Sequence, residues 1–296
     1  MNPVLEARTG AGCRPANRVI SWGARTLDFD RAAYVMGILN CTPDSFHAAS
    51  RLPTLREALK AAERMIEEGA DILDVGGEST RPGSDPVPVD EEVRRVVPVI
   101  AAIRASSAIP ISVDTRNRQT AERALDAGAD IVNDVSAMSH DPGMAALVAE
   151  RGIPVVLMHM RGTPKTMQQR AVYDDVVEDV LRELGASVDA AIAAGVSERR
   201  IIVDPGIGFA KTTADNLRLI QDLARLRELG MPILIGLSRK RFIGEITGRP
   251  VEDRLAGTIA ATALALLAGA DIVRAHDVAE AVATVRIVGA VRRTGR

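Results

Sequence analysis

Aromatic residues are scarce in this chain of 296 residues, where they make up 2% of the sequence. Proteins that bind single-stranded nucleic acid stack the bases on aromatic side chains, so this small supply argues against such a platform. Hydrophobic residues still amount to 47%, which predicts a large core built from Ala, Val, Ile and Leu. The seven aromatic residues are Trp22, Phe29, Tyr34, Phe46, Tyr173, Phe209 and Phe242.

Cysteine is also scarce, and the chain lacks an excess of charge of one sign and long apolar runs. Cys13 and Cys41 cannot form a disulfide framework, and no CxxC spacing suggests zinc, so a reducing compartment is expected. Lys and Arg total 37 and Asp and Glu 39, which argues against a broad nucleic-acid surface but permits a small anion pocket. The N-terminus has no apolar run of signal-peptide length, and the most apolar stretch, near 256–268, is too short to span a bilayer. We therefore expect a cytoplasmic protein without nucleic-acid or membrane partners.

One short pattern recurs along the chain. Gly-Ala-Asp-Ile occupies 69–72, 128–131 and 269–272, and related Gly-X-Pro runs begin at Gly152 and Gly230. Each follows a segment with helical spacing, where Gly caps the helix because it adopts the left-handed conformation at little cost. Each also opens a short, continuous apolar run, which is typical of a strand covered on both faces in a parallel sheet.

Counting all the apolar runs and the helical segments between them gives eight strand–helix units. They predict an α/β fold, a single (β/α)8 TIM barrel over residues 18–296, after a loose Gly/Pro/Arg-rich tail at 1–17. A doubly wound open sheet is the competing interpretation, but no GxGxxG follows the first strand and no linker divides the chain. Strands are expected near 34–39, 71–75, 110–113, 130–134, 154–158, 200–204, 232–236 and 271–274, and helices near 54–69, 89–105, 117–128, 142–151, 173–194, 214–229, 252–268 and 278–293.

Polar residues stand at nearly every predicted strand end, where barrel enzymes have their active sites. A helix cap or a loop hydrogen bond explains any one of them, but not their convergence on one rim, because an unpaired buried polar group costs several kcal/mol. These residues are Asn40, Asp74, Asp114, Asn133, Asp134, Met158, His159, Asp204, Ser238, Arg239, Lys240, Arg274 and His276.

Two groups of these side chains suggest a ligand. Asp114, Asn133 and Asp204 combine donors and acceptors that suit the amino-pyrimidinone edge of a pterin or a guanine. Arg274 and His276 stand two apart on one strand, so both can point the same way and, with Lys240, form a cationic corner for phosphate. The Arg274 guanidinium could also stack on a flat ring.

Asn40 offers a neutral oxygen that suits Mg²⁺, an ion otherwise held by water and phosphate oxygens. The run Ser79-Thr80-Arg81-Pro82-Gly83 adds hydroxyl groups and a cation in a loop. The residues by themselves thus predict a pocket for a heterocycle that carries phosphate.

Eight segments between residues 36 and 278 carry a family resemblance. They are MGILNCTPDSF (36–46), DVGGESTRPG (74–83), ISVDT (111–115), VNDV (132–135), LMHMRGTPKTMQ (157–168), IVDPGIGFAKT (202–212), IGLSRKRFIG (235–244) and VRAHDV (273–278). In these segments and their order the chain resembles the dihydropteroate synthase family of pterin-binding barrels, the targets of sulfonamide drugs.

The resemblance implies a reaction that joins 6-hydroxymethyl-7,8-dihydropterin pyrophosphate to p-aminobenzoate, giving 7,8-dihydropteroate and pyrophosphate in folate biosynthesis. It implies a dissociative substitution at the pterin methylene, a Mg²⁺ cofactor and a homodimer. The residues it implies are Asp114, Asn133, Met158, Asp204, Phe209 and Lys240 for the pterin; Thr80, Arg274 and His276 for the pyrophosphate; Thr80, Arg81, Pro82 and Arg241 for p-aminobenzoate; Asn40 for the metal; and Thr80, Arg81, Lys240, Arg274 and His276 for catalysis.

Two positions depart from the family pattern. The family's first loop usually continues Ser-Asp-Gly-Gly, whereas here Ala48 takes the place of the acid, with His47 either a substitute base or a surface residue. Arg241 stands where the family has the Ser that approaches the benzoate carboxylate, and its guanidinium could pair with that group, crowd the site or point to solvent.

These departures keep three alternatives open. One is a paralogue that binds the pterin pyrophosphate but has an altered or weak activity toward the second substrate. Another is a pterin-binding methyltransferase domain, which should lack the ESTRPG and SRK loops that this chain contains. A non-catalytic binding or regulatory protein is the third, although Asn40, Asp204 and Lys240 are all retained.

Overall fold

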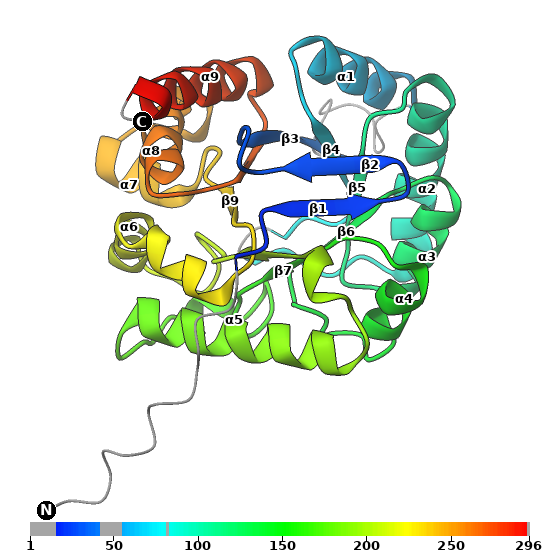
Figure 1. The fold of residues 1–296 in the computed structure, drawn as a ribbon, viewed down its shortest axis with the longest axis horizontal. Coiled ribbons are helices and arrows are strands. Elements are labelled where there is room, and N and C mark those ends of the chain that lie inside the picture. Colours follow the sequence, from blue (N-terminus) through cyan, green and yellow to red (C-terminus); the bar gives the residue numbers. More distant parts are fainter. Residues whose placement is uncertain (1–15, 42–54, 81–82, 295–296) are drawn as a thin grey trace, which may run out of the picture.

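The computed structural model describes residues 16–41, 55–80 and 83–294. Within them, eight parallel strands form one sheet in the order β8-β7-β6-β5-β4-β3-β10-β9, and a parallel bridge from Val203 to Ile233 joins its two edges. Helices surround this ring (Figure 1), so the predicted (β/α)8 TIM barrel is confirmed. The strands are β1 (Val19–Trp22), β2 (Arg25–Asp28), β3 (Tyr34–Asn40), β4 (Ile72–Gly76), β5 (Ile111–Asp114), β6 (Ile131–Asp134), β7 (Val155–Met158), β8 (Ile201–Asp204), β9 (Leu234–Gly236) and β10 (Ile272–Ala275).

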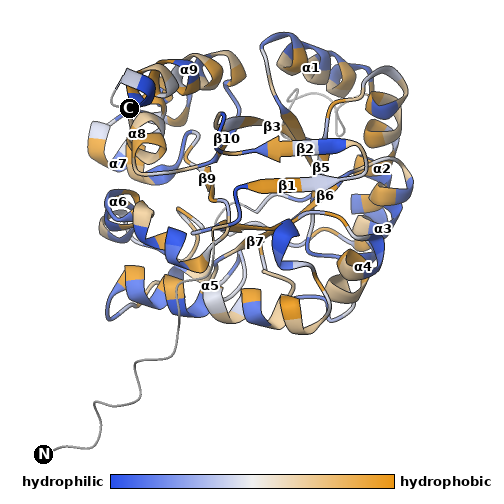
Figure 2. Ribbon diagram, in the orientation of Figure 1, coloured by the Kyte–Doolittle hydropathy of each residue, from blue (hydrophilic) through white to orange (hydrophobic). Residues whose placement is uncertain are grey.

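The barrel strands are short and almost entirely buried, as expected for continuous apolar runs covered on both faces. Their bounds agree with the sequence prediction to within two residues. In Figure 2 the strands are mostly coloured as hydrophobic, whereas the surrounding helices alternate between hydrophobic and hydrophilic residues along their length. The main core therefore lies between the outer wall of the barrel and the inward faces of the helices.

The helices also follow the prediction, with two differences. The segment after Gln221 winds as a 3-10 helix, Leu223–Leu229, before Gly230 ends it in the left-handed conformation. A seven-residue helix directly after Lys240 was not predicted, because it is too short to show a clear apolar period. The helices are α1 (Leu55–Glu67), α2 (Val89–Ser106), α3 (Arg118–Asp126), α4 (Met144–Arg151), α5 (Val176–Ala193), α6 (Thr213–Gln221), α7 (Arg241–Thr247), α8 (Leu255–Leu267) and α9 (Val278–Thr294).

An antiparallel hairpin, β1 and β2, precedes the barrel and was not predicted. It lies across the opening of the ring in Figure 1. Its residues Ile20, Trp22 and Leu27 pack with Phe29 against residues near the start of the barrel strands, such as Ile72. The hairpin thus closes the N-terminal end of the barrel and adds buried aromatic rings to a core expected to be purely aliphatic. The C-terminal ends of the strands are left for the site.

Asn17, the last residue of the predicted tail, is bound to the barrel. Its backbone N–H donates to the Gly230 carbonyl at 2.7 Å, and its side-chain amide donates to the Arg199 carbonyl at 3.0 Å. Residues 1–15 lie outside the described residues, so the division into tail and domain stays a prediction. In the described part of the chain, none of the helices has the length and apolar character needed to cross a membrane.

Candidate active site

The strand register brings the predicted polar residues into one layer at the C-terminal end of the barrel. Asp114 at the end of β5 pairs with Asn133 of β6, and Met158 at the end of β7 pairs with Asp204 of β8. Parallel strands all end at the same rim, so residues from distant parts of the sequence become neighbours there. The residues Asn133 and Asp204 are only 4% and 6% exposed, so their polar groups are almost completely shielded from solvent.

A guanidinium bridges two carboxylates in this layer. Arg274 Nε donates to Asp74 Oδ2 at 2.6 Å, and Arg274 Nη2 donates to Asp114 Oδ2 at 2.7 Å. The amide of Asn133 donates to the same Asp74 oxygen at 3.1 Å. Asp74 is completely buried, and its other oxygen has no hydrogen-bond partner in the described residues. Asp74 therefore fixes both Arg274 and Asn133, a role that sequence reasoning did not assign to it.

Burial controls the protonation of the carboxylates. It raises the pKa of Asp114, and the neighbouring Asp74 raises it further, while Arg274 opposes the change. Burial also raises the pKa of Asp204, against the Gly206 N–H that donates to Asp204 Oδ1 at 2.7 Å and the positive charge of Lys240. The raised pKa of Asp114, about 7, lets this carboxyl group change from acceptor to donor near neutral pH, which suits recognition of a heterocycle.

Lys240 lies over an aromatic ring at the same end of the barrel. Its Nζ is 4.2 Å from the centroid of Phe209, within the range of a cation–π contact. Gly208 allows this approach, since an added Cβ there would lie 3.2 Å from Lys240 Cδ and its φ is +82°. Burial lowers the pKa of Lys240 to about 8, although Asp204 opposes the shift. The lysine is thus a cation that a bound anion would stabilise.

The loops after β9 and β10 are clamped together. Arg239 donates from Nε and Nη2 to the two carboxylate oxygens of Asp277, at 3.0 and 2.6 Å. Arg239 has a φ of +55°, an uncommon value for a residue with a Cβ. The Ser238 hydroxyl accepts the backbone N–H of His276 at 3.2 Å and lies 2.9 Å from its Nδ1. The segments that carry Lys240 and His276 are therefore bound to each other, and the phosphate site that the sequence analysis places there stays a prediction.

The remaining predicted residues are placed less centrally or not at all. Thr80 follows β4 and is partly exposed, whereas Arg81 and Pro82 lie outside the described residues, as do His47 and Ala48. Arg241 begins α7 with 64% of its side chain exposed, and its Nε contacts Glu245 at 2.9 Å. The structure thus brings most of the residues predicted for the pterin and the pyrophosphate to one end of the barrel, and the roles of all the predicted site residues stay a prediction.

Asn40 is the last residue of β3 and pairs in register with Gly76. In the described ranges, no group of three or more His, Cys, Asp or Glu side chains could hold a metal ion. The side-chain oxygen of Asn40 is a donor that suits Mg²⁺, an ion that commonly takes its other ligands from water and phosphate, and the metal site stays a prediction.

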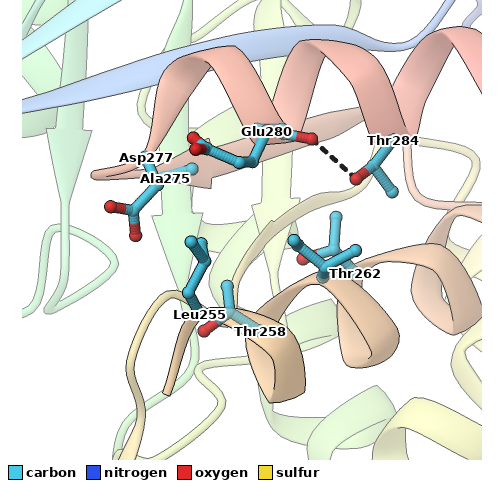
Figure 3. Close-up of a pocket in the computed structure, with 9 residues that line it drawn as sticks. Leu255, Thr258, Thr262, Ala275, Asp277, Glu280 and Thr284 are labelled. Carbon is cyan, nitrogen blue, oxygen red and sulfur yellow. Dashed lines mark hydrogen bonds between the residues drawn. The ribbon is translucent and has the colours of Figure 1, made fainter. Parts of the chain in front are cut away.

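Two hollows lie away from this layer. A small cavity between α8 and α9 is lined by side chains of both helices, with Thr258 and Thr262 facing Glu280 and Thr284 (Figure 3). An open depression is lined by Arg161, Gly162, Gln169 and Arg170. Neither is lined by the residues predicted to bind substrate.

The arrangement matches a known family. The model of a family described as pterin binding enzyme matches residues 36–276. The chain belongs to this family of pterin-binding enzymes. Relatives named dihydropteroate synthase include that of Bacillus subtilis, 45% identical over 94% of this chain and 95% of that protein. That of Synechocystis is 46% identical over 86% of this chain and 89% of that protein.

Solved structures of pterin-binding enzymes superimpose closely. Dihydropteroate synthase of Xanthomonas albilineans with 4-aminobenzoic acid is 48% identical, with a TM-score of 0.87 over 94% of this chain and 99% of that chain. The same enzyme in complex with 7,8-dihydropteroate gives a TM-score of 0.84 at 46% identity, over 93% and 98% of the two chains. That of Yersinia pestis with a sulfonamide drug gives 0.89 at 39% identity, over 93% and 99%.

Several residues that shape this pterin-family site escaped the sequence analysis. The pairing of Arg239 with Asp277 could not be predicted from local sequence patterns, because 38 residues separate the two positions. Lys211 was present in the recognised segment IVDPGIGFAKT but received no role, and His159 was named only as one of the polar residues at the strand ends. The signal that could have found Lys211 is a lone lysine among apolar residues directly after a strand-end loop.

Proposed function

We propose that this chain is a dihydropteroate synthase, a transferase of a non-methyl group that condenses 6-hydroxymethyl-7,8-dihydropterin pyrophosphate with p-aminobenzoate. The observation that carries the proposal is the layer of Asp114, Asn133 and Asp204 beside Arg274, in a chain 43–46% identical to several synthases over most of its length. Relatives with this name and complexes with 4-aminobenzoic acid and 7,8-dihydropteroate support it.

The buried carboxylates and amide bind the pterin. Asp114, Asn133 and Asp204 offer donors and acceptors to its amino-pyrimidinone edge, while Met158 and Phe209 supply apolar contacts. Water is excluded from this depth, so each hydrogen bond discriminates strongly against ligands that lack the matching group.

The leaving pyrophosphate is stabilised by the cationic corner. Arg274, His276 and Lys240 stabilise the negative charge that builds up on the pyrophosphate as the C–O bond breaks and its electron pair leaves with the oxygen. The amine of p-aminobenzoate then attacks the cationic methylene carbon and loses a proton to solvent. The carboxylates Asp114 and Asp204 stabilise the positive charge that develops on the pterin. This path needs no protein nucleophile. Cys41 cannot act as one, because it is 1% exposed and burial raises the pKa of its thiol to about 12.

The second substrate is assigned to Thr80, Arg81, Pro82 and Arg241. Thr80 stands at the rim, and the Arg241 guanidinium can pair with the benzoate carboxylate only if it leaves Glu245. Since this ion pair is largely exposed, breaking it costs little, at most about 1 kcal/mol.

Asn40 is the residue proposed to hold Mg²⁺, which when bound supplies charge neutralisation for the pyrophosphate. The chain's own contribution is one neutral oxygen at the end of β3. The residues that bind and orient the pyrophosphate remain Arg274 and His276, with Thr80 nearby.

We also propose a cytoplasmic homodimer. Leu264 and Leu267 on α8 and Ile287 and Val291 on α9 are each more than half exposed, and these two helices pack side by side. An apolar face of this kind marks an association surface. Because the Yersinia pestis synthase was solved with a sulfonamide, inhibition of this chain by sulfonamides is expected.

The test is an assay of the purified protein with dihydropterin pyrophosphate, Mg²⁺ and p-aminobenzoate that measures both products. Equal amounts of pyrophosphate and dihydropteroate are expected. Binding of the pterin pyrophosphate without product would overturn the synthase proposal and favour the paralogue that the replacements at Ala48 and Arg241 suggest.

A further inference from the structure

A buried lysine that the proposed mechanism does not use lies behind the pterin pocket. Lys211 is 2% exposed. It is one of only four lysines in a chain with 33 arginines. Its Nζ donates to the Phe209 carbonyl at 3.0 Å and contacts His159 Nδ1 at 2.9 Å. An isolated buried ammonium is costly, so these partners must hold it in one place.

His159 links Lys211 to an acidic residue. The ring is 4% exposed, and its Nε2 lies 3.0 Å from Glu183 of α5. Burial and the nearby Lys211 lower the pKa of His159 to about 4, so the ring is neutral. Hydrogen bonds from Arg161 lower the pKa of Glu183 to about 2, so Glu183 is a carboxylate that can only accept. Nε2 of His159 therefore carries the proton that it donates to Glu183, and Nδ1 accepts from Lys211. The hydrogen bonds therefore run in one direction, from lysine through histidine to carboxylate.

An outer layer holds the carboxylate and the loop. Arg161 Nε donates to Glu183 at 3.0 Å, and the Arg161 guanidinium lies 4.0 Å from the centre of the Tyr173 ring. The Tyr173 hydroxyl donates at 2.8 Å to the carbonyl of Ala210, which lies between Phe209 and Lys211 in the chain. The network therefore holds the segment 209–211 through the carbonyl groups of Phe209 and Ala210 and the side chain of Lys211.

This network ends at the predicted substrate residues. The carbonyl that Lys211 binds belongs to Phe209, whose ring lies under Lys240. The His159 N–H donates to the Asp204 carbonyl at 2.9 Å, and Gly206 packs directly against the His159 carbonyl. Asp204 and Phe209 are therefore held from behind by the loop after β7 and by Lys211.

We propose that Lys211 is a positioning residue for the pterin pocket: bound to His159 and to the Phe209 carbonyl, it fixes the segment 204–209 so that Asp204 and Phe209 meet the pterin. The proposal rests on the proposed function. A purely structural site would be served better by an apolar residue, since replacing buried charge with well-packed apolar groups is often neutral or stabilising. The charged side chain at position 211 is explained by its role in orienting Asp204 and Phe209.

The test compares Lys211→Met with Lys60→Met, which changes an exposed lysine of α1. Methionine retains an unbranched apolar side chain, one heavy atom shorter than that of lysine, but cannot donate a hydrogen bond. For Lys211→Met we expect at least tenfold weaker binding of dihydropterin pyrophosphate by calorimetry, an unchanged KM for p-aminobenzoate at saturating pterin, and a melting temperature within a few degrees of the wild type. Lys60→Met should match the wild type throughout.

A second pair keeps the proposal testable if Lys211→Met does not fold. His159→Leu removes the acceptor for Lys211, whereas His159→Asn retains an acceptor near Nδ1, so pterin affinity should fall in the first and largely recover in the second. Pterin affinity equal to the wild type in Lys211→Met or in His159→Leu would overturn the positioning role. If the wild type itself failed to bind the pterin pyrophosphate, the proposed function would fail instead.

Discussion

Gly206 joins the two loops that carry Asp204 and His159, and its replacement by alanine tests that junction. Its φ is +69°, and a Cβ added there would come 1.9 Å from the His159 carbonyl oxygen. The oxygen belongs to a backbone held by the hydrogen bond from His159 N–H to the Asp204 carbonyl, so it has little room to retreat. Gly248 is the matched control, with a φ of +70° and nothing within 4 Å of the added Cβ.

The two alanine variants share one cost and differ in another. In each variant the alanine must adopt a left-handed backbone conformation, which lowers the free energy of unfolding by about 1 kcal/mol. Gly206→Ala must also push the two loops apart, and forced overpacking adds about 3 kcal/mol. At about 3 °C per kcal/mol for a domain of this size, we expect melting temperatures lower by about 3 °C for Gly248→Ala and about 12 °C for Gly206→Ala.

The functional consequence follows from the same contact. Gly206 N–H donates to Asp204 Oδ1, so displacement of the loop should weaken binding of dihydropterin pyrophosphate in Gly206→Ala but not in Gly248→Ala. Thermal unfolding followed by circular dichroism and calorimetric titration measure the two effects. If the two variants had the same melting temperature and bound dihydropterin pyrophosphate with equal affinity, the loop junction would not support the pocket.

Three further predictions concern single side chains. Asp204→Ala should abolish calorimetric pterin binding, because it removes a buried acceptor and its charge; retained affinity would refute the pocket assignment. Arg241→Ser should raise the KM for p-aminobenzoate severalfold in steady-state assays, and an unchanged KM would show that Arg241 does not bind the acid. Burial lowers the folded pKa of Lys211 from 10.5 to about 7, so between these values the unfolded chain binds more protons and this group's contribution to stability rises with pH. Lys211→Met should therefore flatten the rise of unfolding free energy from pH 7 to 10, and an unaltered slope would contradict the burial of its charge.

The sequence alone determined the barrel and the rim. Glycines such as Gly69, Gly128 and Gly269 end helices in the left-handed conformation, and continuous apolar runs follow them, so local conformation and burial are written in adjacent residues. The rim followed because strand ends converge in any barrel of this class. The hairpin at Val19–Asp28 escaped because its four-residue strands carry too little apolar pattern, and their pairing depends on the barrel end that they cover.

Only the tertiary structure decided which polar groups pair. Arg274 finds Asp74 across 200 residues of sequence, and Lys211 finds His159 across 52. Local patterns carry no information on such partners, because hydrogen bonds depend on distances of about 3 Å that closure of the barrel sets. The same closure buries these groups and thereby shifts their pKa values. The residue types of the site could thus be predicted from the sequence. Their ion pairs and pKa shifts could not, because these depend on how the folded chain packs.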